Sequence, residues 1–310
     1  MDTGMKEALK EICRQIYFDE PLSQHTTIRV GGAADVLLYP QTIEELTHIV
    51  LLARKNKTPL FVLGAGSNLL VRDKGIRGLV VSLSRGFSTI RLEREEGDQA
   101  LLYSEAGVGV PRLVDFCAER GFSGVEALAG IPGNMGGVLF MNAGTPDGEI
   151  ADVVTHVTFL DREGKLVTWS REEVKFSYRA SHFPRGAILL SARLSLTHQE
   201  VSQIQEKVRS YRQRRVDSQP LQIPNLGSIF KNPKKEKGKG LHAGKLVEEA
   251  GLKNIRVGGA RISPKHGNFI VNEGGATAKD ILALMGLMRD KVKEKFGVTL
   301  EAEVKVVGEE

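Results

Sequence analysis

The chain has 310 residues, of which 41% are hydrophobic and 26% charged, and its formal net charge at pH 7 is +5. This length predicts about two or three domains, and this composition is typical of a globular protein rather than a disordered one. The charge is modest, and a nucleic-acid binder would normally show a concentrated basic face with a matching fold motif, so the sequence predicts no nucleic-acid partner and favours a site for anionic small molecules. The densest basic run, residues 234–239, is predicted to be a solvated loop.

Neither a metal site nor a targeting segment is predicted. Cys13 and Cys117 lie far apart and form no C-x-x-C motif, so they are predicted to be buried free thiols. The histidines show no metal-ligand spacing. Residues 1–15 lack the apolar core of a signal peptide, and no apolar stretch is long enough to span a membrane. We therefore expect a cytoplasmic protein without a membrane segment or an obligate protein partner.

The first half of the chain contains helical and extended patterns in turn. Apolar residues at helical spacing predict helices over residues 5–16, 44–56 and 110–120, the second of them capped by Thr42. Short apolar runs between turn residues predict strands over residues 36–39, 59–63, 78–83, 90–94 and 101–106. The last two strands are expected to pair.

The second half gives an α+β order without a regular βαβ repeat. A glycine-rich stretch over residues 129–148 has too few periodic positions to be helical throughout. Strands are predicted over residues 153–160, 166–170, 187–196, 268–272 and 302–307, the first three of them antiparallel. Helices are predicted over residues 199–215, 244–250 and 277–296. Pro220 and Pro224 mark a domain boundary.

Two glycine-rich loops predict a nucleotide site. The run Gly64-Ala65-Gly66-Ser67-Asn68 begins like a G-x-G-x-x-G fingerprint, but Leu69 replaces the third glycine, and no Walker A lysine follows. Its amides still suit a pyrophosphate, with a tight turn as the alternative. A second cluster, residues 130–137 followed by Met141-Asn142-Ala143-Gly144, favours a dinucleotide bound by both loops. Asn142 is expected to hydrogen-bond a ring or a phosphate, or to form an Asx turn.

A series of short motifs runs through nearly the whole chain. They are Thr26-Thr27-Ile28-Arg29-Val30-Gly31-Gly32, the stretch 63–70, the stretch from Gly130-Ile131-Pro132-Gly133 to Gly144, Phe176-Ser177-Tyr178-Arg179, Gln219-Pro220-Leu221, Gly227-Ser228-Ile229-Phe230-Lys231-Asn232-Pro233, and Leu300-Glu301-Ala302-Glu303-Val304. Each motif is weak alone, but the ordered set resembles the UDP-N-acetylenolpyruvoylglucosamine reductase family. The chain is similar to the shorter subclass, because no long insert follows Arg179. Residues 145–147 and the basic run depart from the common pattern, which leaves the local loop shape open.

The resemblance implies an α+β fold with an FAD-binding domain of the vanillyl-alcohol-oxidase type, made of two α+β subdomains, and a smaller α+β substrate domain. The implied parts are an N-terminal helix over residues 1–24, the FAD-binding domain over 25–198 with subdomains of about 25–84 and 85–198, the substrate-binding domain with its connecting helix over 199–299, and a C-terminal strand over 300–310 that returns to the active site.

The resemblance also implies the reaction, which is NADPH-dependent reduction of the enolpyruvyl group of UDP-N-acetylenolpyruvoylglucosamine to UDP-N-acetylmuramate in peptidoglycan precursor synthesis. FAD is expected to be bound non-covalently. The implied FAD-binding residues are Arg29, Gly64, Ala65, Gly66, Ser67, Asn68, Ile131, Pro132, Gly133, Gly136, Gly137, Asn142, Ala143 and Gly144. The implied substrate-binding residues are Tyr178, Lys231, Asn232, His266 and Lys305.

Three residues are predicted to be catalytic. An enol ether resists hydride attack unless charge flows into its carboxylate, so the enzyme needs a cation there and an acid for the resulting carbanion. Arg179 suits the first role through bidentate binding, with a surface salt bridge as the alternative. Ser228 suits the second if a close geometry, Lys231 or a water assists it; otherwise it is a turn residue. The resemblance makes Glu303 the third, although Glu301 shares its face of the predicted strand.

Two other functions stay open on the sequence. One is an FAD oxidase or dehydrogenase of the same fold that acts on an alcohol or a hydroxy acid, although no His or Cys stands out as a flavin tether. The ordered motifs of Arg179, Ser228 and Glu303 favour the reductase. The other is a non-catalytic nucleotide-binding protein that has kept the glycine loops, and the intact motifs of Arg179 and Ser228 weigh against it.

Overall fold

The computed structural model describes residues 3–233 and 241–310, so the predicted basic loop 234–239 lies outside the described residues. The chain forms two compact units. Unit 1 comprises Met1–Phe18, Asp35–Ala65 and Gly78–Arg214, and unit 2 comprises Asp19–Ala34, Gly66–Arg77 and Arg215–Glu310. Two early segments, 19–34 and 66–77, thus belong with the C-terminal third of the chain. The contiguous domain boundaries implied by the sequence stay a prediction.

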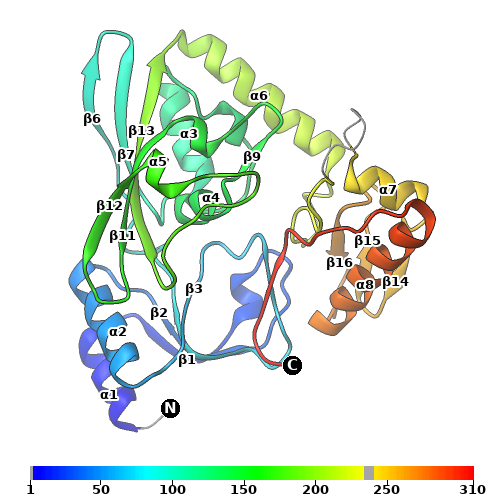
Figure 1. The fold of residues 1–310 in the computed structure, drawn as a ribbon, viewed down its shortest axis with the longest axis horizontal. Coiled ribbons are helices and arrows are strands. Elements are labelled where there is room, and N and C mark those ends of the chain that lie inside the picture. The colour runs from blue at the N-terminus through cyan, green and yellow to red at the C-terminus, as the bar shows by residue number, and fades with distance from the viewer. Residues whose placement is uncertain (1–2, 234–240) are drawn as a thin grey trace. The chain divides into compact units, whose positions relative to one another are not determined.

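The N-terminal part of unit 1 packs helices α1 (Thr3–Ile12) and α2 (Ile43–Lys55) with a small sheet (Figure 1). The four strands of this sheet have the order β1-β2-β5-β3, with the bounds Ile16–Pro21, Ala33–Leu38, Ile76–Val81 and Leu60–Val62. Thr42 caps α2, as predicted, because its hydroxyl accepts a hydrogen bond of 3.1 Å from the backbone N–H of Glu45. Apolar side chains of both helices and of the strands form the core of this part.

The prediction of a helix over residues 5–16 is wrong at its C-terminal end. The helix ends at Ile12, and strand β1 begins at Ile16. The residues Ile16-Tyr17-Phe18 are β-branched and aromatic, a composition that favours extended backbone. Alternate residues of β1 are the less exposed ones, as expected for a strand with one covered face.

The larger sheet of unit 1 has six antiparallel strands. Its order is β12-β11-β13-β7-β6, with β8 paired to β13, and the bounds in that order are Leu166–Ser170, Val154–Leu160, Ile188–His198, Gln99–Glu105, Ile90–Glu96 and Phe122–Ser123. The predicted pairing of the strands near residues 90–94 and 101–106 is confirmed. The three antiparallel strands predicted between residues 153 and 196 are confirmed as well.

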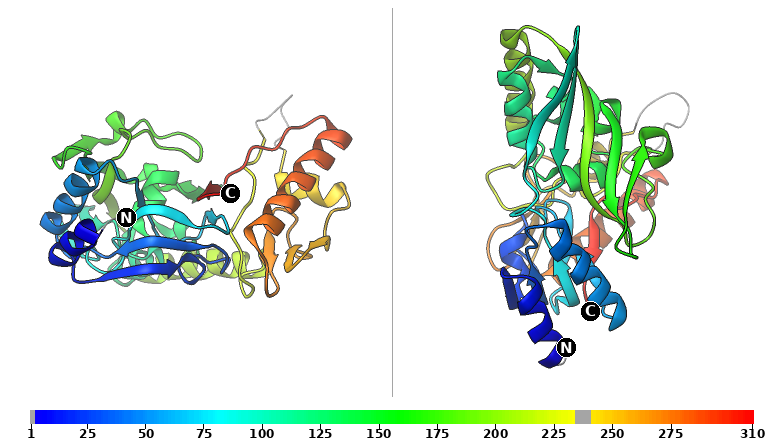
Figure 2. Two further views of the ribbon diagram at one scale, coloured as in Figure 1. Left: turned by 90° about the horizontal axis from the view of Figure 1, so that it is seen from below. Right: turned by 90° about the vertical axis from the view of Figure 1, so that its left-hand side faces the viewer.

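Three helices contribute to the core that covers this sheet: α3 (Val110–Glu119), α4 (Met135–Met141) and α6 (Val201–Ser218). Figures 1 and 2 show α3 and α6 on the same face of the sheet. Helix α4 occupies only the middle of the glycine-rich stretch, which is therefore not helical throughout, as predicted. The remaining elements of unit 1 are short: η2 Glu126–Leu128, β9 Gly144–Thr145, β10 Gly148–Glu149, η3 Ile150–Asp152 and α5 Arg171–Val174.

Unit 2 packs helices α7 (Ala243–Glu249) and α8 (Ala278–Phe296) with a three-stranded antiparallel sheet (Figure 2). The order of this sheet is β14-β15-β16, with the bounds Arg256–Val257, Ala260–Ile262 and Ile270–Asn272. A separate parallel pair joins β4 (Leu69–Val71) to β17 (Lys305–Val307). The short helix η1 covers Leu22–His25.

The final strand differs from the predicted strand over residues 302–307, because β17 begins only at Lys305. The backbone N–H groups of Glu303 and Val304 both point to the carbonyl oxygen of Ile229, at 2.9 Å and 3.4 Å. Two successive donors on one acceptor break the alternation of a strand. An isolated antiparallel bridge pairs Ala302 with Phe230, so Glu301 and Glu303 flank this bridge instead of lying in one continuous strand with β17.

Among residues 3–233 and 241–310, no helix is both long enough and apolar enough to cross a lipid bilayer.

Candidate functional site

The predicted site residues divide between the two units. Unit 1 holds Gly64, Ala65, Ile131, Pro132, Gly133, Gly136, Gly137, Asn142, Ala143, Gly144, Tyr178 and Arg179. Unit 2 holds Arg29, Gly66, Ser67, Asn68, Ser228, Lys231, Asn232, His266, Glu303 and Lys305. Each unit brings together residues that are far apart in the sequence.

The loop that follows β3 carries a row of backbone donors. Within the part of the chain that the structure describes, the N–H groups of Gly64, Ala65, Gly66 and Asn68 have no hydrogen-bond acceptor. Gly64 and Ala65 are also exposed. A run of unpaired N–H groups along one short loop suits an anion such as a pyrophosphate.

Gly66 and Arg29 hold unusual backbone conformations in unit 2. Gly66 has a φ of +64°, and a Cβ on it would lie 2.2 Å from the carbonyl oxygen of His25, so only glycine fits. Arg29 has a φ of +58° in a turn closed by a hydrogen bond of 3.1 Å from its N–H to the carbonyl of Thr26. A non-glycine residue in this region is strained, and such positions concentrate at binding sites.

The second glycine-rich loop presents further donors in unit 1. The N–H groups of Gly133, Asn134 and Gly137 have no acceptor among the described residues, whereas the N–H of Gly136 donates to the carbonyl of Ala106 at 2.8 Å. A Cβ on Gly137 would meet no atom within 4 Å, so this residue faces open space. The loop thus combines anchored backbone with donors that are free for a ligand.

Asn142 is fully buried, and its side chain is used inside unit 1. Its Nδ2 donates to the carbonyl of Ser177 at 3.0 Å, and its Oδ1 accepts from the N–H of Ala151 at 3.3 Å. Its φ of +43° ends helix α4 in the left-handed conformation. Because both polar groups of the side chain are engaged within unit 1, Asn142 fixes the loop, and its predicted contact with a ligand stays a prediction.

A tight turn places Arg179 beside that loop. Ser177 and Ala180 exchange backbone hydrogen bonds of 2.9 Å and 3.0 Å, and Arg179 between them has a φ of +55°. Its Nη2 donates to the carbonyl of Gly144 at 2.8 Å, and its guanidinium carbon lies 5.2 Å from the centre of the Tyr178 ring. The predicted flavin loop and the predicted carboxylate-binding arginine therefore form one cluster.

In unit 2, Ser228 lies next to the segment that carries Glu303. Gly227 turns the chain with a φ of +72°, and its N–H donates to Oδ1 of Asn225 at 2.9 Å. Directly after Ser228, the carbonyl of Ile229 accepts the N–H of Glu303 at 2.9 Å. The two residues predicted to be catalytic in this unit are thus separated by one residue and one backbone hydrogen bond.

Asn68, in the loop after β3, is hydrogen-bonded to the segment of unit 2 that carries Glu303. The side-chain amide of Asn68 donates to the carbonyl of Glu303 at 3.1 Å, and the carbonyl of Asn68 accepts the N–H of Lys305 at 3.0 Å. Residues near 68, 228 and 303 are therefore adjacent, although more than half of the chain separates the first from the last.

Lys231 and Asn232 have partners within the protein. The Nζ of Lys231 lies 2.6 Å from a carboxylate oxygen of Glu301, whose side chain is 73% exposed, so this is a solvent-facing ion pair. The Oδ1 of Asn232 accepts the N–H of Ala243, the first residue of α7, at 3.0 Å. The predicted roles of these side chains in substrate binding stay predictions.

His266 lies in the turn that contains Asn268, whose carbonyl accepts the N–H of Ile229. Its Nδ1 accepts the N–H of Asn268 at 3.1 Å, so the neutral ring carries its proton on Nε2. Burial lowers the pKa of His266, and the nearby carboxylate of Glu248 opposes that shift. Asn268 is a buried site residue that sequence reasoning missed; its only signal was a polar residue directly before the apolar run 269–271.

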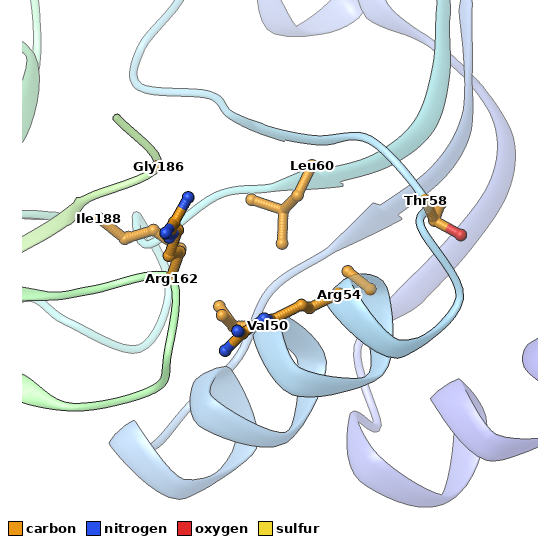
Figure 3. A pocket seen from close by; sticks show the side chains of 8 residues that line it. Val50, Arg54, Thr58, Leu60, Arg162, Gly186 and Ile188 are labelled. Atoms are coloured by element: carbon orange, nitrogen blue, oxygen red, sulfur yellow. The ribbon is translucent and has the colours of Figure 1, made fainter. Parts of the chain in front are cut away.

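Unit 1 also contains a cavity of about 400 Å³. Figure 3 shows its lining residues, which are Val50, Ala53, Arg54, Thr58, Leu60, Arg162, Gly186 and Ile188. None of them is a predicted site residue. Elsewhere in the described ranges, 3–233 and 241–310, no group of three or more His, Cys, Asp and Glu residues is arranged to hold a metal ion.

Two domain families match the chain. Residues 219–307 match the C-terminal domain of UDP-N-acetylenolpyruvoylglucosamine reductase, and residues 34–170 match an FAD binding domain. The chain is 42% identical over 306 residues to the UDP-N-acetylenolpyruvoylglucosamine reductase of Caldanaerobacter subterraneus subsp. tengcongensis, which covers 98% of this chain and 97% of the relative. It is 42% identical over 309 residues to the reductase of the same name from Moorella thermoacetica, with 100% and 96% covered.

Two solved structures resemble this chain, one of them a reductase of the same family and the other in fold alone. The UDP-N-acetylenolpyruvylglucosamine reductase of Thermus caldophilus superimposes with a TM-score of 0.79 at 39% identity, over 94% of this chain and 98% of that chain. A glucose dehydrogenase, Phl p 4.0202, superimposes with a TM-score of 0.50 at 15% identity over 64% of this chain and 44% of that chain, which is a likeness of fold alone. The predicted α+β fold class with an FAD-binding domain is confirmed.

Proposed function

The chain belongs to the UDP-N-acetylenolpyruvoylglucosamine reductase family, and from this premise we propose that it reduces the enolpyruvyl ether of UDP-N-acetylenolpyruvoylglucosamine to the lactyl ether of UDP-N-acetylmuramate. NADPH is the hydride donor, FAD is bound non-covalently, and the reaction belongs to the cytoplasmic stage of peptidoglycan precursor synthesis. The small-molecule substrate is anionic, in agreement with the positive balance of the chain.

The glycine loops fit a flavin dinucleotide. The unpaired N–H groups of Gly64, Ala65 and Gly66 suit its pyrophosphate, and the open space beside Gly137 leaves room for a ligand at the second loop. The bound flavin supplies hydride that originates from NADPH. The roles of the individual loop residues are part of the proposal.

Arg179 is proposed to bind the substrate carboxylate. Its guanidinium stays charged at any physiological pH and stabilises negative charge that develops beside the carboxylate. The hydrogen bond from its Nη2 to Gly144 and the left-handed turn fix its direction before substrate binds. A donor that is oriented in advance needs no reorganisation during the reaction.

Ser228 is proposed to donate a proton from its Oγ to the carbon that carries the negative charge. A serine hydroxyl is a weak acid, so the donor must be held close to that carbon and aimed at it. Glu303 is proposed to act beside it, as a proton relay or by polarising the carboxylate end of the substrate. The observation that carries this pairing is the 2.9 Å hydrogen bond from the N–H of Glu303 to the carbonyl of Ile229, the residue after Ser228.

The function is tested by following the flavin through its two half-reactions under anaerobic conditions. We expect the purified protein to carry flavin absorbance, to be bleached by NADPH, and to regain its colour when the enolpyruvyl nucleotide is added. Absence of flavin, or no reoxidation by that nucleotide, would contradict the proposal.

Substitution of the proton donor separates the two halves. We expect Ser228→Ala to leave bleaching by NADPH within about twofold of wild type and to slow reoxidation by the substrate by about a hundredfold or more, the usual range for a lost acid. Equal slowing of both half-reactions would indicate a damaged flavin site and would remove Ser228 from the role of acid.

A further inference from the structure

Asn268 makes a two-point contact with the backbone of Phe230. Its Oδ1 accepts the N–H of Phe230 at 3.0 Å, and its Nδ2 donates to the carbonyl of the same residue at 2.8 Å. Asn268 is 3% exposed and Phe230 is 2% exposed, so water does not compete for these bonds. An amide is matched to this task because it carries a donor and an acceptor side by side.

The backbone of Asn268 adds a third bond to the same segment. Its carbonyl accepts the N–H of Ile229 at 2.9 Å, and its own N–H is held by Nδ1 of His266 at 3.1 Å. The segment that follows Ser228 is therefore fastened along one edge by a single residue, whose own position is fixed by the turn that contains His266.

The opposite edge of this segment is bonded to the C-terminal part of the chain. The carbonyl of Ile229 accepts the N–H of Glu303 at 2.9 Å, and the N–H of Lys231 donates to the carbonyl of Glu301 at 2.9 Å. Without the side chain of Asn268, this edge would keep only the backbone bond from Ile229 to residue 268, and the buried N–H and carbonyl of Phe230 would lose their partners. Unpaired buried backbone groups are costly, so the segment would shift to find new ones.

We propose that Asn268 is a positioning residue for proton transfer, which sets the location of the Ser228 hydroxyl by fixing the backbone of the two residues that follow it. This inference rests on the proposed function of Ser228. Asn268 does not touch the substrate; it acts through the peptide of Phe230. Proton donation depends steeply on placement, and a displacement of about 1 Å lowers a rate by on the order of a hundredfold.

The test uses the flavin-loaded protein and three variants. Asn268→Leu has a similar volume and neither polar group. Asn268→Asp keeps an acceptor for the N–H of Phe230 but, when ionised, has no donor for its carbonyl. Thr277→Ala is the control, because Thr277 caps α8 in the same unit. Its hydroxyl accepts the N–H of Asp280 at 3.1 Å, which is a bond within that helix cap and not to the Ser228 segment.

For Asn268→Leu, we expect reoxidation by the enolpyruvyl nucleotide to slow by at least about tenfold, with bleaching by NADPH and flavin content within about twofold of wild type. Amide hydrogen exchange of the peptide that contains Phe230 should speed up in this variant, because its N–H has lost its acceptor. Thr277→Ala should leave both half-reactions and the exchange of that peptide unchanged while lowering the melting temperature.

The aspartate variant provides a signature that lost stability alone does not produce. Burial raises the pKa of an aspartic acid at this position, and its neutral form again offers a donor and an acceptor to Phe230. Relative to wild type at the same pH, we expect the reoxidation rate of Asn268→Asp to recover by about three- to tenfold as the pH falls from about 8 to about 6. Asn268→Leu should show no such recovery.

Two results would overturn the proposal. One is a reoxidation rate of Asn268→Leu that equals that of wild type or falls only in parallel with bleaching by NADPH. The other, decisive if the leucine variant does not fold, is an Asn268→Asp protein whose relative rate does not change with pH. Failure of the proposed function is a separate outcome, because the wild-type protein itself would then not be reoxidised by the nucleotide.

Discussion

The side-chain amide of Asn68 donates a hydrogen bond of 3.1 Å to the carbonyl oxygen of Glu303, across a separation of 235 residues. The carbonyl of Asn68 accepts the N–H of Lys305 at 3.0 Å, so this residue holds both ends of the C-terminal turn that carries Glu303. The loop whose free N–H groups suit a flavin pyrophosphate is thereby tied to a residue proposed to act on the substrate.

Asn68→Ala should therefore affect catalysis as well as stability. Loss of this hydrogen bond should lower the free energy of unfolding by about 1 kcal/mol and slow reoxidation of the flavin by substrate. The matched control is Asn56→Ala, which removes a similar bond of 2.9 Å from an exposed amide to the carbonyl of Leu52. Urea unfolding and stopped-flow absorbance measure the two effects. Identical reoxidation rates in both variants would show that the bond to Glu303 is only structural.

Substitution by alanine should destabilise the protein at one glycine of the first loop and weaken flavin binding at another. In Gly66→Ala the new Cβ would lie 2.2 Å from a backbone oxygen at a φ of +64°, which predicts a loss of stability on the order of 2–4 kcal/mol. In Gly64→Ala the Cβ meets no atom within 4 Å, so the protein should fold normally. If a flavin passes along this loop, Gly64→Ala should still weaken flavin binding. The measurements are urea unfolding and fluorescence titration with FAD, and normal flavin affinity in Gly64→Ala would argue against a ligand there.

Arg179→Lys tests whether the shape of the cation matters. A lysine keeps the charge but loses the planar fork that binds a carboxylate at two points. We expect reoxidation by substrate to slow by about tenfold or more, with bleaching by NADPH unchanged. Arg185→Lys, at an exposed arginine of the same region, should be silent in both half-reactions. An Arg179→Lys enzyme as active as wild type would contradict a carboxylate-binding role for Arg179.

The buried ring of His266 predicts a pH dependence of stability. Burial lowers its pKa in the folded protein below the usual value of 6.5. The unfolded chain then binds the proton more readily, so the free energy of unfolding falls as the pH decreases through about 6.5 and levels off below the folded pKa. His266→Asn should lack this component, whereas His48→Asn, at an exposed histidine, should retain it. Urea unfolding between about pH 5 and pH 8 measures the difference. Parallel curves for wild type and His266→Asn would contradict the assignment.

Local periodicity and short motifs were sufficient to predict part of this protein from its sequence. The antiparallel strands around Phe159 and the helix capped by Thr42 follow from patterns within a few residues of chain, because alternation and capping are local properties. The ordered motifs around Gly66, Arg179 and Ser228 were sufficient to predict the family.

Which polar groups contact one another depends on the tertiary fold and could not be predicted. Asn68, Ser228 and Glu303 come together through hydrogen bonds between distant segments, and no periodicity in the sequence encodes such pairs. The same cause ends the last strand early, since Ala302 forms an isolated bridge with Phe230 and only Lys305–Val307 pair with β4.

The roles of individual side chains also depend on the tertiary fold. In the sequence, Asn142 was the conspicuous asparagine and Asn268 was not. In the fold, both are buried and both use the two ends of their amide, but Asn142 holds its own loop whereas Asn268 holds the segment after Ser228. An amide has the same donor and acceptor everywhere in a sequence, and only the backbone groups that the fold brings within about 3 Å decide what it does.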